Sequence, residues 1–198
     1  HPITKTCAIV DYAHTPDALD NVLQTILQTK YDTQNIITVI GCGGDRDKAK
    51  RPKMAQIAAS LSSRVVLTSD NPRSEDPEKI LDDMEAGLKN KNADHVLRMV
   101  DRKQAIKTAI ALSRDRDIIL VAGKGHEKYQ DIKGEKFLFD DKEIIRKAKE
   151  RLLSLELKIA ITKTNIVFSD NEKKRIDLLN TLKGHKRGVW DINFSPVE

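Results

Sequence analysis

The run Val65-Val66-Leu67-Thr68-Ser69-Asp70-Asn71-Pro72-Arg73 joins an apolar segment to a turn rich in hydrogen-bonding groups. The apolar part is typical of a buried strand, and Pro72 makes the chain leave that strand, because proline has no N–H and disfavours a helical residue before it. Asp70 is an acceptor, Asn71 both donates and accepts, and Arg73 is a planar fork of five donors. This set suits a small zwitterion with a carboxylate and an ammonium. An Asn-Pro turn with a solvated Arg73 is the alternative, which these residues alone leave open.

Strand and helix patterns alternate on both sides of this run. Continuous apolar runs predict buried strands over residues 6–10, 35–40, 64–68, 95–100 and 117–122. Amphipathic segments predict helices over residues 16–29, 50–61, 77–88, 101–112 and 140–153. Residues 129–139 predict a small hairpin that turns at Lys133-Gly134. The sequence therefore predicts an α/β fold, in which a Rossmann-like, open and mostly parallel sheet has helices on both faces.

The chemically dense stretches all follow predicted strands, at residues 11–17, 41–51, 70–73 and 123–127. Parallel strands bring their carboxyl ends to one edge of the sheet, and ligands of such sheets bind beyond that edge. We therefore expect these four loops to share one rim, although they lie far apart in the sequence.

Two of the four loops are rich in glycine. Gly41-Cys42-Gly43-Gly44 lets backbone N–H groups approach a phosphate or a carboxylate, and the charges of Asp45-Arg46-Asp47 favour a ligand there. The spacing is not that of a P-loop, and a tight turn is the alternative. In Gly123-Lys124-Gly125-His126-Glu127, the functional interpretation has Glu127 facing an ammonium and Gly123 making a backbone contact. The alternative is a flexible turn with an exposed lysine.

The basic residues and histidines near these loops have simpler interpretations. A solvated helix start with some attraction for anions is predicted for Lys48, Lys50, Arg51 and Lys53. His14 and His126 have no visible set of partners with metal-ligand spacing, so no metal site is predicted.

Composition limits the class of protein. The chain has 198 residues, 39% of them hydrophobic, which permits one domain with an appendage and a modest core. A net charge of +5 without aromatic residues among the basic ones favours anionic ligands such as nucleotides over nucleic acid. Cys7 and Cys42 are expected to be small buried thiols in a reducing compartment. With no membrane-length apolar run and no signal-peptide pattern, we expect a cytoplasmic protein without membrane contact. Because the first residue is His1 and not Met, we expect a piece of a longer protein.

Four motifs, in this order, carry a resemblance to a known family. They are Asp11-Tyr-Ala-His-Thr-Pro-Asp17, Gly41-Cys-Gly-Gly-Asp-Arg-Asp-Lys-Ala-Lys-Arg-Pro52, Asp70-Asn-Pro-Arg73 and Val121-Ala-Gly-Lys-Gly-His-Glu127. Together they resemble the C-terminal domain of Mur ligases, of the kind that adds 2,6-diaminopimelate to UDP-N-acetylmuramoyl-L-alanyl-D-glutamate in peptidoglycan biosynthesis. The resemblance covers about residues 7–150, and it implies that residues 1–153 form this domain.

The resemblance implies an ATP-dependent reaction. In the family, ATP phosphorylates the free carboxylate of the nucleotide precursor, and the amine of the amino acid attacks the acyl phosphate. The C-terminal domain holds the amino acid and closes over ATP. Asp11 and His14 match the motif of the loop that faces the nucleotide, and Asp11 is expected to contact ATP.

By the same motif positions, several residues are expected to bind meso-diaminopimelate. Its far-end amino-acid head group is assigned to Gly123 and Glu127. Arg73 is expected to pair with the second carboxylate that lysine lacks, through charge-assisted bonds worth roughly 1.5–3 kcal/mol each. An unpaired Arg73 disfavours lysine. The remaining assignments are Arg46 and Asn71 as binding residues, with Asp70 and Pro72 shaping the loop.

Parts of the family's machinery are missing from this sequence. In the family, a central domain supplies a phosphate-binding loop, a carbamylated lysine and the magnesium ligands, and an N-terminal domain binds the UDP-sugar. We therefore expect ATP and Mg²⁺ to be bound mainly by domains absent from this chain. No catalytic residue is assigned, and the chain alone is expected to be inactive.

Residues 154–198 are predicted to be a separate tail, either disordered or rich in short strands, with strands over residues 155–162 and 165–169. The run from Leu182 to Pro196 resembles the opening of a WD40 propeller blade, with a Gly-His pair before an alternating strand. A blade needs four strands, so this piece cannot fold alone. The alternative function is a non-enzymatic WD40-type interaction protein that carries a Mur-like segment.

Overall fold

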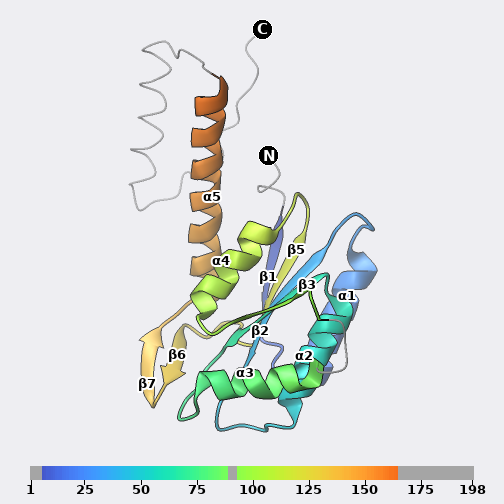
Figure 1. Cartoon of the computed structure of the whole chain (residues 1–198), viewed down its shortest axis with the longest axis vertical. Coiled ribbons are helices and arrows are strands. Elements are labelled where there is room, and N and C mark those ends of the chain that lie inside the picture. The colour runs from blue at the N-terminus through green and yellow to red at the C-terminus, as the bar shows by residue number, and fades with distance from the viewer. Residues whose placement is uncertain (1–5, 89–92, 165–198) are drawn as a thin grey trace. The chain divides into compact units, whose positions relative to one another are not determined.

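The computed structural model describes residues 6–88 and 93–164, with side chains described up to residue 155. Within these residues, five parallel strands form a sheet in the order β1-β5-β2-β3-β4 (Figure 1). The strands are β1 (Cys7–Asp11), β2 (Ile36–Cys42), β3 (Arg64–Ser69), β4 (Val96–Met99) and β5 (Ile118–Ala122). This arrangement confirms the predicted open parallel sheet and its strand positions.

Helices cover both faces of the sheet, as predicted. The described helices are α1 (Pro16–Thr29), α2 (Lys50–Leu61), α3 (Pro77–Glu85) with a short 3₁₀ turn (Ala86–Leu88), α4 (Arg102–Leu112) and α5 (Asp141–Thr164). Local sequence signals set where they begin. The Thr15 hydroxyl accepts a hydrogen bond from the Ala18 N–H at 3.3 Å, and Pro16 occupies the first turn of α1. The Asp101 carboxylate caps α4 through the Gln104 N–H at 3.1 Å.

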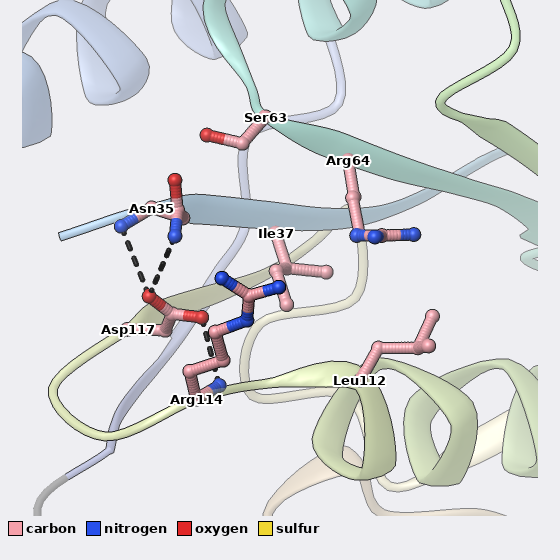
Figure 2. Close-up of a pocket in the computed structure, with 7 residues that line it drawn as sticks. All are labelled: Asn35, Ile37, Ser63, Arg64, Leu112, Arg114 and Asp117. Carbon is pink, nitrogen blue, oxygen red and sulfur yellow. Dashed lines mark hydrogen bonds between the residues drawn. The ribbon is translucent and has the colours of Figure 1, made fainter.

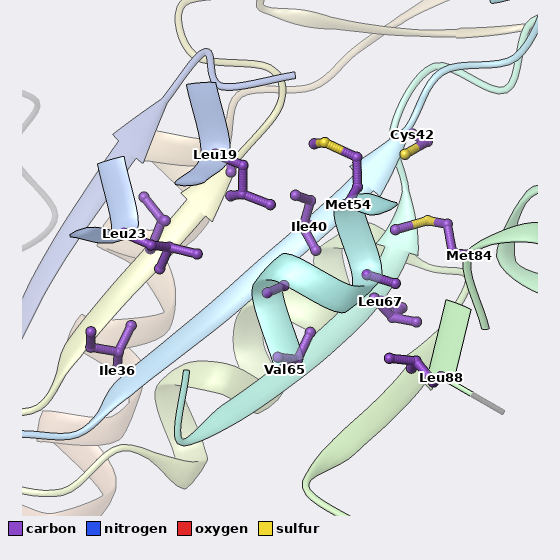
Figure 3. Packing of buried hydrophobic residues seen from close by; sticks show 14 of the residues in the cluster. Leu19, Leu23, Ile36, Ile40, Cys42, Met54, Val65, Leu67, Met84 and Leu88 are labelled. Carbon is purple, nitrogen blue, oxygen red and sulfur yellow. The ribbon is translucent and has the colours of Figure 1, made fainter. Parts of the chain in front are cut away.

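Successive residues of the central strands face opposite sides of the sheet. Ile36 and Ile40 of β2 join an apolar cluster with Met54 of α2 and with side chains of α1 and α3 (Figure 3). Ile37 and Val39 join a second cluster, formed with α4 and α5 on the other face. Each such side chain stabilises the fold by roughly 1.5–3 kcal/mol when fully buried. Burial on both faces explains why the strand sequences are continuously apolar.

Strand β1 is less buried than the sequence predicts. It pairs with β5 alone and lies at the edge of the sheet, so its residues stay partly exposed. The expectation of two buried thiols is therefore wrong for Cys7, which is exposed, and confirmed for Cys42, which is buried. Burial raises the pKa of the Cys42 thiol to about 12.

Helix α5 extends further than predicted. Residues 155–162 were expected to form a strand, but they continue the helix to Thr164. From Asp141 to Thr164 the sequence has no glycine or proline, and its many Leu, Glu, Lys and Ala residues favour helix. The chain divides into two compact units, His1–Glu156 and Leu157–Glu198, and the sheet with its loops belongs to the first. The other tail predictions, over residues 165–169 and Leu182–Pro196, lie outside the described residues.

A two-stranded hairpin follows the sheet, as predicted. Strands β6 (Tyr129–Ile132) and β7 (Glu135–Leu138) pair antiparallel. Lys133 and Gly134 form the turn with φ of +54° and +84°, which matches the turns that two-residue hairpin loops favour. In the described part of the chain, no helix is long and apolar enough to cross a membrane.

Candidate functional site

The four dense loops do meet at the carboxyl edge of the sheet, because β1, β2, β3 and β5 run parallel. The Gly44 N–H donates to the Asn71 carbonyl oxygen at 2.9 Å, and the Gly123 N–H donates to the Asp11 carbonyl oxygen at 3.1 Å. A Cβ added at Gly44 would lie 1.9 Å from the Pro72 carbonyl oxygen, so this contact between loops requires glycine. The prediction of one shared rim is confirmed, whereas the binding roles of its residues remain predictions.

Asn71 lies at the centre of the rim. Its side chain is buried, with 3% of the residue exposed. Its Nδ2 donates to Glu127 Oε2 at 2.9 Å, and its Oδ1 accepts from Lys124 Nζ at 2.7 Å and from the Asp131 backbone N–H at 3.0 Å. One side chain therefore connects the loops after β3 and β5 with the hairpin.

Lys124 is buried beside Asn71, with none of its surface exposed. Its Nζ lies 3.1 Å from Asp70 Oδ1 and 3.5 Å from Glu127 Oε2. The interpretation of this loop as a turn with an exposed lysine is therefore wrong. Within this chain, the ammonium that Glu127 faces is that of Lys124. No sequence signal shows which way a lysine between two glycines points.

Arg73 is held in an unusual backbone conformation by the hairpin. Its φ is +52°, in the left-handed region that few non-glycine residues adopt. Its N–H donates to the Asp131 carbonyl oxygen at 3.0 Å, and its carbonyl oxygen accepts from the Lys133 N–H at 2.7 Å. Its Nη1 donates to the Gly44 carbonyl oxygen at 2.7 Å, which uses one of five donors. These hydrogen bonds therefore hold the backbone and the guanidinium of Arg73 in place.

Arg46 lies close to Arg73 across the glycine loop. A Cβ added at Gly43 would lie 2.8 Å from Arg73 Nη1 and 3.8 Å from Arg46 Cγ. Arg46 is exposed and donates from Nη1 to the Asp45 carbonyl oxygen at 3.2 Å. The Asp45 carboxylate accepts the Ser74 hydroxyl at 2.7 Å, and this hydrogen bond lowers the pKa of Asp45. The structure therefore brings together Arg46 and Arg73, two residues that the sequence assigned to one ligand.

The loop after β1 presents a different set of groups. Asp11 Oδ1 accepts the Ala13 N–H at 2.8 Å, which shapes the loop, and the exposed His14 ring lies against Tyr12 with 4.6 Å between ring centroids. Lys50 Nζ donates to the His14 carbonyl oxygen at 2.8 Å. The ring of Tyr12 also lies 5.4 Å from that of His126, so the loops after β1 and β5 are neighbours.

Arg51 corrects one prediction. It was expected in a solvated helix start, but none of its surface is exposed. Its guanidinium contacts both Glu75 oxygens at 2.8 and 3.0 Å, Asp83 Oδ2 at 2.8 Å and the Gly43 carbonyl oxygen at 3.2 Å. The bonds from Arg51 to Glu75 lower the pKa of Glu75 to about 2. The carboxylates come from the segment after β3, which the helix sequence alone does not reveal. Lys48 and Lys53 are exposed, as expected.

A second buried arginine, Arg102, lies beneath the loop after β5, and the sequence did not single it out. Its Nε and Nη2 donate to the two Asp141 carboxylate oxygens at 2.9 and 2.7 Å, and Nη2 also donates to the Ala122 carbonyl oxygen at 3.1 Å. Both side chains are almost fully buried. Asp140 caps α5 through the Lys142 and Glu143 N–H groups, while Asp141, the first residue of that helix, pairs with Arg102.

A cavity of about 210 Å³ lies at the opposite, amino edge of the sheet (Figure 2). Its lining includes Asn35 before β2, Arg64 at the start of β3, and Arg114 and Asp117 before β5. Asp117 Oδ1 accepts from the Asn35 backbone N–H at 3.0 Å and from Asn35 Nδ2 at 3.2 Å, and Oδ2 accepts the Arg114 N–H at 2.8 Å. The carboxylate therefore ties the two loops of this edge together.

Comparisons with known proteins identify the family of this chain. A family model described as Mur ligase, glutamate ligase domain, matches residues 3–125. The chain belongs to the Mur ligase family. As a Mur ligase chain, it is 58% identical over 149 residues to the UDP-N-acetylmuramoyl-L-alanyl-D-glutamate–2,6-diaminopimelate ligase of Cytophaga hutchinsonii, covering 75% of this chain and 30% of that relative. The ligase of the same name from Phocaeicola vulgatus is 57% identical over 139 residues, covering 70% of this chain and 29% of that relative.

A solved structure of a UDP-N-acetylmuramoyl-L-alanyl-D-glutamate–2,6-diaminopimelate ligase has the same fold, with a TM-score of 0.70 and 44% identity, covering 75% of this chain and 30% of that one. These matches confirm the resemblance to the C-terminal domain of such ligases. The chain spans about 30% of the length of the relatives described above. The matches give the WD40-type alternative no support.

Proposed function

We propose that this chain is the amino-acid-binding domain of an ATP-dependent ligase that joins meso-diaminopimelate to UDP-N-acetylmuramoyl-L-alanyl-D-glutamate. The carrying observation is the paired position of Arg46 and Arg73 beside Gly43, on the rim that also holds Asn71 and Glu127. Guanidinium groups match carboxylates, and a carboxylate matches an ammonium. The substrates are those in the names of the two relatives described above.

Diaminopimelate carries two amino-acid head groups, so it needs donors and acceptors at both ends. In the proposal, Arg73 with Arg46 and Asn71 binds carboxylate groups, Gly123 and Glu127 bind the far-end head group, and Asp70 and Pro72 shape the loop. Lysine lacks the second carboxylate, which leaves Arg73 without its partner. A missing charge-assisted bond of this kind costs roughly 1.5–3 kcal/mol.

ATP belongs to the same proposal, with Asp11 and His14 on the side of this chain that faces the nucleotide. When bound, ATP supplies the phosphoryl group that activates the precursor's carboxylate. Among the described side chains, over residues 6–88 and 93–155, no group of three His, Cys, Asp or Glu could hold a metal ion. The described side chains offer no such cluster, and in the proposal Mg²⁺ is assigned mainly to other parts of such a ligase, as the family resemblance implies. Residues 1–153 as the domain, residues 154–198 as a separate tail, and a cytoplasmic location remain predictions.

A chimeric ligase tests this proposal. The matching 149 residues of the Cytophaga hutchinsonii ligase are replaced by those of this chain, and ADP release is measured with the precursor and either meso-diaminopimelate or L-lysine. We expect turnover with diaminopimelate and a strong preference for it over lysine. The unaltered relative is the matched control, and the 198-residue chain alone is expected to show no ligase turnover. A folded chimera that releases no ADP with diaminopimelate, or that uses lysine equally well, contradicts the proposal.

A further inference from the structure

The orientation of the Asn71 amide is fixed by its neighbours. Its Oδ1 accepts two bonds, from Lys124 Nζ at 2.7 Å and from the Asp131 N–H at 3.0 Å, while Nδ2 donates to Glu127 Oε2 at 2.9 Å. A flipped amide would direct NH₂ at an ammonium and at another N–H, and its oxygen at a carboxylate. All three contacts would then become repulsive.

Lys124 contributes the strongest of these constraints, because its charge-assisted bond is short and buried. We propose that Lys124 is a positioning residue that sets the hydrogen-bonding polarity of the rim. With the amide oxygen held by Lys124, Asn71 presents its second N–H, a donor, to a ligand. Lys124 and Asn71 both contact Oε2 of Glu127, so these contacts leave Oε1 as an acceptor. Donor and acceptor thus face a ligand from adjacent side chains.

The formal charges beneath the rim support the same polarity. Asp70, Glu127 and Asp141 carry three negative charges, and Lys124 and Arg102 carry two positive ones. Arg102 interacts electrostatically with Asp70 and Glu127 as well as with Asp141. One negative charge is left in this cluster, which an incoming ammonium at Glu127 would balance. The ligand class is a zwitterion that directs its carboxylate at Asn71 and its ammonium at Glu127, and this ligand part rests on the proposed function.

A merely structural lysine is the competing explanation, in which Lys124 only neutralises buried Asp70. The two explanations differ in what they predict for Asn71. A positioning lysine controls the orientation of the amide and the binding of the amino acid. A neutralising lysine affects only stability. The hairpin offers a matched control, since Lys136 Nζ and Lys124 Nζ both lie near the Tyr129 ring, at 4.5 and 5.8 Å, while the described contact with Asn71 is made by Lys124.

The first experiment uses NMR on the 198-residue chain and its variants. In the unaltered chain, nuclear Overhauser effects should connect the Asn71 side-chain NH₂ with Glu127 and not with the Asp131 N–H. Lys124→Met should weaken hydrogen-exchange protection of the Asp131 N–H at least about 10-fold, the change expected for losing a bond to a charged group. Lys136→Met should leave it unchanged. If Lys124→Met does not fold, the measurement is repeated on the double variant Lys124→Met and Asp70→Asn, in which the unpaired carboxylate is removed. The reverse pattern of Overhauser effects in the unaltered chain overturns the proposal.

The second experiment measures Michaelis constants in the chimeric ligase. Lys124→Met should raise the KM for meso-diaminopimelate at least about 10-fold and change the KM for ATP less than about twofold. Lys124→Arg, which restores a cationic donor, should recover part of the loss. Equal effects on both substrates, or none on either, overturn the positioning role. A chimera that never uses diaminopimelate contradicts the proposed function instead, and the NMR result on the Asn71 amide stands apart from it.

Discussion

The two edges of the sheet carry similar residues and use them differently. At the carboxyl edge, Lys124 and Arg102 are buried and paired with carboxylates from other segments of the chain. At the amino edge, Arg64 and Arg114 are exposed around a cavity of about 210 Å³. There, the buried Asp117 accepts mainly backbone N–H groups. Positive charge at a sheet edge is therefore not enough to identify a site.

Helix polarity explains part of this difference. Helix α4 ends at Leu112, next to the amino-edge cavity, and the carbonyl groups of a helix end carry partial negative charge. The amino-edge arginines line the same cavity as Leu112 and Asp117, and the negative charge there reduces their attraction for an anion. The carboxyl edge instead brings four loops together around Asn71, so its polar groups converge on one place.

The largest expected difference between the edges is in stability. Asp141→Ala leaves Arg102 buried without its carboxylate, which should lower the free energy of unfolding by about 3–5 kcal/mol. Asp117→Ala at the amino edge removes hydrogen bonds to N–H groups near a cavity and should cost only about 1–2 kcal/mol. Urea unfolding followed by circular dichroism measures both variants. Equal losses would show that the buried ion pair is no different from the amino-edge carboxylate.

The next largest effect should be on substrate binding. In the chimeric ligase, Arg73→Ala or Arg73→Lys should raise the KM for meso-diaminopimelate roughly 10- to 100-fold, since one charge-assisted pair is lost. The KM for ATP should change far less. Arg114→Gln at the amino edge is the control and should alter neither constant. A similar rise for both substrates after substitution of Arg73 would remove its assigned role.

A smaller effect is expected on the pH dependence of stability. The pKa of Glu75 lies at about 2 because of its bonds to Arg51. A carboxyl with a lowered folded-state pKa stabilises the fold above its ordinary pKa of about 4.5, and this contribution is lost as pH falls through about 2. The stability advantage of the unaltered chain over Glu75→Gln, about 1–2 kcal/mol, should therefore persist at pH 5 and shrink towards pH 2. A difference that does not depend on pH would contradict this assignment.

The smallest effect is expected for the amino-edge arginines themselves. Both side chains are exposed, and surface substitutions of this kind usually change stability by no more than about 0.5 kcal/mol. Arg64→Gln combined with Arg114→Gln should therefore unfold at nearly the same urea concentration as the unaltered chain. A loss above about 1 kcal/mol would show that this edge also depends on its charges.

Local signals in the sequence were enough for most of the fold. The bounds of α1 and α2 agree with the prediction because Pro16 and Pro52 mark their first turns and the strands beside them are continuously apolar. The prediction that the four loops share one rim followed from the parallel arrangement of the strands. Burial of Arg51, Lys124 and Arg102 could not be predicted, because their carboxylate partners lie on other elements or beside a turn of unknown direction. The end of α5 was missed because its apolar residues fit a strand as well as a helix.

The close approach of Gly44 to Pro72 has a consequence for the thermodynamics of binding. The two loops share a backbone hydrogen bond and a contact that admits no side chain, so neither can move far without the other. The hairpin further holds Arg73 through its backbone. A ligand that enters such a preorganised rim loses little free energy to ordering the protein. Ligand binding should accordingly cost this domain little conformational entropy. Most of the conformational entropy lost on binding should be that of the ligand.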